Sequence, residues 1–260
     1  MASNAAPQPG QTYLSFNGSS AYVEIPSRAE YSVDTNQALT VSAWMSADVE
    51  IFLRPECGKY YVHWMGKGQT FGDGGNQEWV CRMYTKPAPE PDGDRTKRTS
   101  FYVFNPAGGL GVGSYVQEDV PVKTWRLIVG VADDRRTRLY RNGELTHCDT
   151  YRGEGTSDCK IMTHDGQQVV INPVHGDAPL RIGTQNFDSF FMGGITRVRI
   201  WGRALTPDEI KALYQADEDP PDGLVAEFML NSDTGTTAID SSSLANHGVI
   251  VDGIWAKVEA

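Results

Sequence analysis

The stretch GITRVRIWGRALTPDEIKALY, residues 194–214, decides the fold. Its first half alternates apolar and polar residues, which is typical of a β-strand with one side on a core. Thr206 is a favourable helix N-cap, Pro207 suits the first helical position, and Glu209 completes a capping box three residues after the threonine. The stretch therefore predicts a strand that ends in one short helix near residues 206–215.

Short runs of β-branched and aromatic residues, separated by turn residues, fill most of the remaining chain. Strands are predicted at residues 12–16 and 21–25, around Asn17-Gly18, which is a hairpin or tight-turn signal. The sequence Arg-Asn-Gly-Glu at residues 141–144 predicts a type I′ hairpin. Because helical patterns are almost absent elsewhere, we expect an all-β fold, a two-sheet antiparallel sandwich.

Length and charge restrict the function classes. The chain has 260 residues, enough for one large β domain, and a formal net charge of −10 at pH 7. No basic stripe is available for phosphates, so we expect no nucleic-acid partner. No apolar run approaches the roughly 18 residues of a membrane helix, so membrane insertion is not expected either. The opening MASNAAPQPGQ lacks a signal-peptide pattern, which leaves the compartment unknown.

Two polar segments, residues 85–99 and 147–178, interrupt the strand pattern and are predicted to be surface loops. The second contains Cys148 and Cys159, which bracket a polar, glycine-containing sequence. A disulfide would suit such a loop, whereas reduced thiols would be ordinary in a cytosolic protein. No Cys-x-x-Cys pair occurs, so zinc binding through sulfur is not expected.

Several of these segments resemble laminin G-like modules of the concanavalin A-like lectin and glucanase superfamily. They are YLSFNGSSAYVEIP (13–26), LTVSAWM (39–45), WRLIVGVADDRRTRLYRNGEL (125–145), and the stretch from Leu180 to Tyr214. Together they cover about residues 12–214. The resemblance implies a jelly-roll sandwich with a concave and a convex face, and it favours an extracellular setting.

The tail GLVAEFMLNSDTGTTAIDSSSLANHGVIVDGIW, residues 223–255, resembles segments that usually precede the first strand in this family. One interpretation is circular permutation, with residues 223–256 pairing beside the N-terminal strands. Leu224, Ala226 and Phe228 would then enter the sandwich. The other interpretation is the stump of a second module, but roughly 35 residues cannot bury a core alone. We therefore expect a single domain over residues 1–260, with residues 12–214 as its main body.

Modules of this superfamily often hold one Ca²⁺, so the resemblance implies a possible structural calcium site. The matching positions are Asn17, Gly18, Asp240 and Asn246, in turns that permutation would bring together. Such a cation prefers six or more oxygen ligands. Thr196 stands where related modules usually place an aspartate, so one carboxylate is missing. Alternatively, Asp240 caps its own turn.

Glycan hydrolysis is the first enzymatic hypothesis for this fold. Retaining glycosidases need two carboxylates roughly 5 Å apart, which the glucanases of the superfamily present in an E-x-D-x-x-E strand. The sequence contains no such triplet, and Glu78 alone is interpreted as a polar rim residue. A polysaccharide lyase would need a Tyr or His base and a group that neutralises a uronate. Such residues exist, so a lyase remains an alternative.

Sugar binding without catalysis requires an aromatic platform and a few planar polar groups. Such residues gather in VHWMGKG, QEWVCRMY and SFYVFN. The candidate ligand-binding residues are His63, Trp64, Arg82, Tyr84, Tyr102 and Asn105. Strand alternation places Trp79 and Cys81 on one face and Arg82 and Tyr84 on the other, and we expect the second pair to face solvent.

The sequence thus predicts a non-catalytic recognition module that binds carbohydrate. A polysaccharide lyase that acts on an acidic glycan is one alternative. A protein interaction or assembly module is another, and it would show an apolar patch or dimer face instead of a groove. The expected partner is a glycan, acidic polysaccharides included, or a protein, and the step from fold to ligand is analogy.

Overall fold

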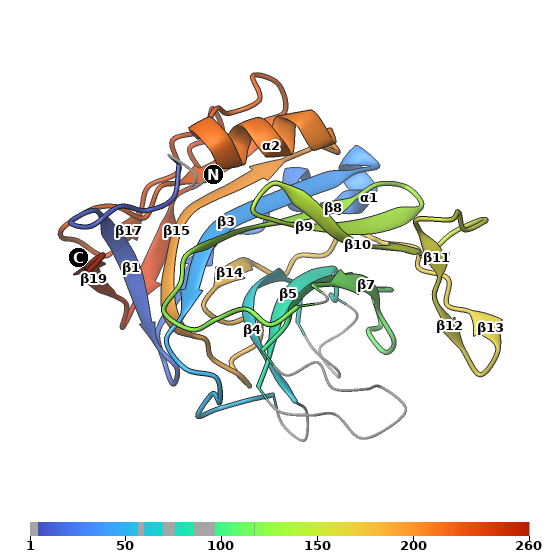
Figure 1. Ribbon diagram of the computed structural model, residues 1–260, viewed down its shortest axis with the longest axis horizontal. Helices are drawn as coiled ribbons and strands as arrows, with labels where there is room; N and C mark the ends of the chain where they lie inside the picture. The colour runs from blue at the N-terminus through green and yellow to red at the C-terminus, as the bar shows by residue number, and fades with distance from the viewer. Residues whose placement is uncertain (1–4, 57–59, 70–75, 86–96, 117, 260) are drawn as a thin grey trace.

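Two antiparallel β-sheets face each other and enclose the main core in the computed structural model (Figure 1). The structure describes residues 5–56, 60–69, 76–85, 97–116 and 118–259. Sheet A contains β1 (Thr12–Asn17), β3 (Leu39–Ala47), β8 (Arg126–Ala132), β9 (Arg136–Arg141), β10 (Glu144–Thr150), β11 (Lys160–Ile161), β15 (Met192–Trp201), β16 (Leu224–Phe228) and β19 (Ile254–Lys257). Sheet B contains β2 (Tyr22–Ile25), β4 (Tyr61–Lys67), β5 (Trp79–Tyr84), β6 (Thr99–Val103), β7 (Val112–Tyr115), β14 (Leu180–Ile182), β17 (Thr237–Ala238) and β18 (Gly248–Val251). The predicted all-β jelly-roll sandwich is confirmed.

The predicted helix is α2 (Pro207–Ala216), and it begins with the expected capping box. The Glu209 N–H donates to Thr206 Oγ1 at 3.3 Å, and the Thr206 N–H donates to Glu209 Oε2 at 2.8 Å. Hydrogen bonds from Arg203 are the main reason why the pKa of Glu209 falls to about 2. Two short helical turns, η1 (Ala29–Tyr31) and α1 (Val33–Asn36), were not predicted from the sequence.

Two predicted turns have different outcomes. β9 and β10 form the expected hairpin, in which Asn142 and Gly143 have φ values of 54° and 82°, as a type I′ turn requires. Of the two predicted alternatives, the Asn17-Gly18 turn is the tight turn and not the hairpin, because β1 and β2 belong to different sheets. Asn17 Oδ1 accepts the N–H groups of Ser19, Ser20 and Ala21, so its side chain closes the turn without a ladder.

The C-terminal tail supplies strands to both sheets. β16 pairs with β15, β18 pairs with β2, and β19 pairs with β1, so the first and the last strand of the chain lie side by side (Figure 1). Ala226 and Phe228 are buried in the core between the sheets. Leu224 instead packs outside that core, because a register shift at Ile200 and Trp201 turns it to the other face. The assignment of the whole chain to one domain stays a prediction.

The outer face of sheet A is covered by α2, which lies across β15 and β3 (Figure 1). Ile210 and Leu213 of the helix join a second apolar cluster with Trp44, Tyr140 and Trp201 of the sheet. Because these strands are covered on both faces, every residue of β3 is buried. No described helix covers the outer face of sheet B, but most of its side chains are buried, and Tyr61 and Arg82 are among those that stay partly exposed.

The two predicted surface loops are only partly loops. Residues 86–96 lie outside the described residues, and Thr99 already belongs to β6. The segment 147–178 begins within β10 and contains the hairpin of β12 (Thr163–His164) and β13 (Gln167–Gln168), which projects from the sandwich (Figure 1). Cys148 and Cys159 form a disulfide in this segment. All helices in the described part of the chain are too short or too polar to cross a bilayer.

Candidate functional site

The outer face of sheet B carries the predicted polar and aromatic residues of β5. Trp79, Cys81 and Met83 point into the core, so Arg82 and Tyr84 lie on the opposite face, as strand alternation predicts. Arg82 is partly exposed, whereas Tyr84 is buried. This face is therefore the surface on which a ligand could meet Arg82.

Alternation along β4 separates two neighbouring candidates. Val62 and Trp64 point into the core, so His63 faces outward beside Arg82, and the register shift that follows His63 places Met65 in the core as well. Trp64 is fully buried, and its Nε1 donates to Thr99 Oγ1 at 3.0 Å. The prediction that Trp64 binds a ligand is wrong, because strand alternation turns its side chain into the core, opposite to His63.

Aromatic rings surround the Arg82 guanidinium. Its central carbon lies 4.2 Å from the ring centre of Tyr61, 5.0 Å from that of Tyr102 and 5.1 Å from that of Phe104. The hydroxyls of Tyr84 and Tyr102 lie 3.4 Å apart. We call this group the Arg82 cluster, and its members are Glu56, Tyr61, His63, Arg82, Tyr84, Tyr102 and Phe104.

His63 orients the guanidinium as a neutral acceptor. Burial and, to a smaller extent, Arg82 hold the pKa of His63 well below 6.5. Arg82 Nε donates to His63 Nε2 at 3.2 Å, which places the imidazole proton on Nδ1. Nδ1 lies 3.5 Å from both Glu56 Oε2 and Ser189 Oγ, and because the imidazole is neutral the contact with Glu56 is not an ion pair. Both ring nitrogens of His63 therefore have partners within the protein.

Glu56 is held in place by the loop that follows β14. Burial raises the pKa of its carboxyl group. Asn186 Nδ2 donates to both carboxylate oxygens, at 3.1 and 3.3 Å. Because Asn186 contacts Glu56, the loop after β14 lies beside the Arg82 cluster.

Phe187 in this loop was missed by the sequence analysis. Its side chain is 38% exposed, and its backbone φ of 67° is unusual for a bulky residue. The Arg181 guanidinium lies 4.3 Å from the ring centre, and Tyr22 contacts the ring edge-on at 5.0 Å between centroids. No strand pattern marks this position, so the sequence provided no signal beyond the aromatic residue itself.

Asn105 does not belong to the Arg82 cluster, contrary to the prediction. It lies beyond the end of β6, and its side chain holds the long segment after β10. Asn105 Nδ2 donates to Val170 O at 3.1 Å, and its Oδ1 accepts the Asn172 N–H at 2.8 Å. His63, Arg82, Tyr84 and Tyr102 are thus the predicted residues that the fold brings together.

The four predicted calcium ligands do not form one site. Asn17 and Gly18 precede β2, whereas Asn246 donates from Nδ2 to Pro26 O, just after the other end of β2. Strand β18 of the tail pairs with β2, but the two turns lie at opposite ends of β2. In the parts of the chain that the structure describes, no cluster of His, Cys, Asp or Glu could hold a metal ion.

Asp240 is used by its own turn, as the alternative interpretation proposed. Its carboxylate accepts the N–H groups of Glu227, Ser242 and Asn246 at 3.0, 2.9 and 2.9 Å. Asn17 is likewise engaged by its turn, so this donor set does not fit calcium. Calcium binding elsewhere stays a prediction.

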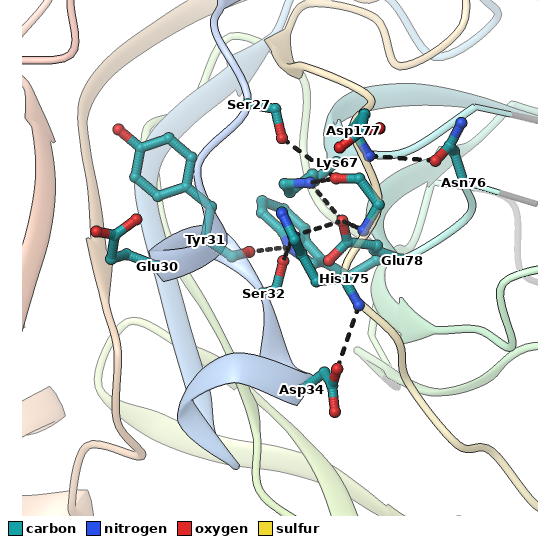
Figure 2. Close-up of polar contacts among 12 residues, drawn as sticks. Ser27, Glu30, Tyr31, Ser32, Asp34, Lys67, Asn76, Glu78, His175 and Asp177 are labelled. Atoms are coloured by element: carbon teal, nitrogen blue, oxygen red, sulfur yellow. Dashed lines mark hydrogen bonds and ion pairs between the residues drawn. The ribbon is translucent and has the colours of Figure 1, made fainter.

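A buried ion pair lies at the other end of β4 and β5 (Figure 2). Lys67 is fully buried and pairs with Glu78, which is 4% exposed, so the prediction of Glu78 as a rim residue is wrong. Lys67 Nζ also donates to Gly176 O at 2.7 Å, and the Gly176 N–H donates to Glu78 Oε1 at 3.0 Å. The pair therefore fastens the segment around Gly176 to sheet B.

Ser32, His175 and Glu78 lie together beside this pair but do not form a catalytic triad (Figure 2). Ser32 Oγ lies 2.8 Å from His175 Nδ1, and Glu78 Oε1 lies 3.8 Å from the same nitrogen. A triad requires the hydroxyl and the carboxylate on opposite ring nitrogens. Ser32 is also fully buried. The arrangement is therefore structural.

Comparisons with known proteins agree with this architecture. A laminin G family model, described as Concanavalin A-like lectin/glucanases superfamily, matches residues 17–211. The chain therefore belongs to this superfamily, and the predicted resemblance is confirmed. No curated protein matches the sequence.

Two solved structures show the same fold at low sequence identity. One is described as a candidate carbohydrate-binding protein from Bacteroides ovatus, with 15% identity, a TM-score of 0.58 and coverage of 96% of this chain. This chain spans 61% of that protein's length. The other is a heptameric SAP-like pentraxin from Limulus polyphemus, with 13% identity, a TM-score of 0.56 and coverage of 96% and 95% of the two chains.

Proposed function

We propose that the chain is a carbohydrate-binding module without catalytic activity, and that its glycan lies against the Arg82 cluster on the outer face of sheet B. The observation that carries this proposal is a partly exposed arginine beside the partly exposed ring of Tyr61, with the buried rings of Tyr102 and Phe104 also around it. Aromatic rings accept the apolar face of a pyranose, and planar polar groups fix its orientation.

Three further points support this proposal. The outer face of sheet A is occupied by α2, whereas no described helix covers Tyr61 and Arg82, which are both partly exposed on sheet B. Phe187 exposes part of its ring and belongs to the loop whose Asn186 holds Glu56. Lectins also belong to the superfamily that the family model defines.

A lyase would need a side chain that is free to remove a proton from the sugar. His63 is fully buried, and both of its ring nitrogens already have partners. This geometry favours binding over chemistry, and the lyase alternative becomes one outcome of the experiment.

The test is binding to a glycan array, with and without a calcium chelator, followed by overnight incubation with each hit. We expect binding without new unsaturated sugar ends. Tyr61→Ala, which removes a ring from the Arg82 cluster, should weaken binding, whereas Leu145→Ala on the exposed surface of β10 should not. New unsaturated ends would make the protein a lyase, and silence on every glycan would favour a protein partner.

A further inference from the structure

Several arginines with limited exposure are paired with carboxylates, whereas no ion pair of Arg82 is found among the described residues. Arg181 Nε lies 2.8 Å from Glu24 Oε2, and Arg199 NH1 lies 2.8 Å from Asp217 Oδ1. Other ion pairs of this kind join Arg138 to Asp133 and Arg203 to Glu209. Within the described parts of the chain, no carboxylate oxygen lies within ion-pair distance of the Arg82 guanidinium. Among the described residues, its positive charge therefore has no direct counter-ion.

The surroundings of Arg82 hold the guanidinium without neutralising it. The aromatic rings pack around it, and His63 takes the Nε hydrogen bond as a neutral acceptor. Glu56 interacts with Arg82 electrostatically, but its carboxylate is directed to His63 and Asn186. Among the described residues, the terminal nitrogens of Arg82 have no hydrogen-bond acceptor. A planar pair of charged donors is thus left for a ligand.

The two terminal nitrogens of the Arg82 guanidinium are suited to bind a carboxylate. A guanidinium can donate two parallel hydrogen bonds to the two oxygens of a carboxylate, and these charge-assisted bonds are stronger than those to a neutral hydroxyl. The protein carries a formal net charge of −10, so an acidic polymer is repelled over most of the surface. A local unpaired arginine is then needed to hold such a polymer.

We propose that Arg82 pairs with the carboxylate of an acidic sugar and thereby determines which glycans the module binds. The inference rests on the proposed function, because it concerns the same face of sheet B. It adds a ligand class, glycans that contain uronic or sialic acid.

The experiment compares carboxylated polymers with their own carboxyl-reduced forms. Polygalacturonate, alginate and polysialic acid are each titrated beside the reduced polymer, which keeps the sugar backbone but loses the charge. Charged hydrogen bonds contribute about 1.5 to 3 kcal/mol, so the acidic form should bind about 10- to 100-fold more tightly. The preference should weaken at high salt.

Three variants assign the preference to Arg82. Arg82→Gln should reduce the ratio between acidic and reduced forms to about one, and Arg82→Lys should give an intermediate ratio, because it keeps the charge but loses the fork. Arg135→Gln removes the same charge from an exposed turn of sheet A and should leave the ratio unchanged. Thermal unfolding confirms that each variant is folded, and Arg82→Lys keeps the test valid if Arg82→Gln does not fold.

Each outcome decides between the two proposals. Equal binding of acidic and reduced polymers would overturn the role of Arg82 and leave carbohydrate binding intact. Equal binding of dextran sulfate would show that any anion suffices, and would overturn the assignment to a carboxylate. Failure of every polymer, acidic or reduced, would overturn the proposed function together with this inference.

Discussion

The two outer faces of the sandwich use aromatic residues in opposite ways. On sheet A, Trp44 and Trp201 lie under α2, and the ring of Tyr214 from the helix stacks on Trp44 at 5.9 Å. On sheet B, Tyr61 and Tyr102 surround the charged Arg82 instead. The rings that pack against α2 therefore belong to a second core, whereas the rings that pack around the Arg82 guanidinium belong to a candidate binding surface.

The largest expected effect is a loss of stability on the outer face of sheet A. Trp201→Ala removes a fully buried side chain from the cluster under α2. The cavity should lower the free energy of unfolding by about 3 to 5 kcal/mol, measured by urea denaturation. Glycan affinity of the folded variant should stay unchanged. A variant of normal stability that no longer binds would show that the sheet A face contributes to recognition.

Variants of the buried ion pair between Lys67 and Glu78 test whether these charges stabilise the fold without contributing to glycan binding. Lys67→Met leaves Glu78 buried without its cation, which should cost roughly 3 kcal/mol of stability. Lys67→Met combined with Glu78→Leu should recover most of this loss in the same urea experiment. If either variant changed glycan affinity while folded, the division between structural and binding charges would have to be abandoned.

His63 gives the sheet B face its own pH dependence. Its pKa is depressed in the folded protein, so below about pH 6.5 the unfolded state binds a proton that the folded state does not. The free energy of unfolding should therefore decrease as the pH falls, by up to about 1.4 kcal/mol per pH unit. His63→Gln keeps an acceptor for Arg82 but cannot titrate, so it should flatten this decrease.

Other groups near this pH range act in the opposite direction. Burial raises the pKa of Glu56, and it raises that of Asp219 to about 6, so both contribute stability as the pH falls. The quantity to measure is therefore the difference in unfolding free energy between wild type and His63→Gln at about pH 7 and about pH 5. Parallel curves would mean that His63 is not held neutral by burial.

The smallest expected effect concerns the edge of the binding face. Phe187→Ala removes a partly exposed ring, so stability should change by less than about 0.5 kcal/mol. If the ring stacks on a sugar, glycan affinity should fall by about 3- to 10-fold, measured by calorimetry beside Leu145→Ala as control. Unchanged affinity would confine the site to the Arg82 cluster.

Features that depend on neighbours in the chain were predictable. The capping box of α2 needs only Thr206 and Glu209, and the β9–β10 turn needs only Asn142-Gly143. Alternation along β5 likewise placed Arg82 opposite Trp79. These are local preferences of backbone and side chain, which the sequence carries directly.

Features that depend on distant contacts were not predictable. Met65 follows Trp64 into the core because the pairing with β5 shifts after His63, and Glu78 is buried with Lys67 as its partner. The turn at Asn17 has hairpin chemistry, yet its two strands find partners in different sheets. Pairing between strands depends on the whole sandwich, so a local pattern cannot report it.

The sequence by itself determined the class of fold, the position of its helix and four of the residues that meet on one face, because repeating patterns and turn residues encode them. The tertiary structure alone decided that this face surrounds an arginine with no ion-pair partner among the described residues. That result depends on a neutral His63 and on Glu56, which a loop more than 100 residues away in the chain holds through Asn186.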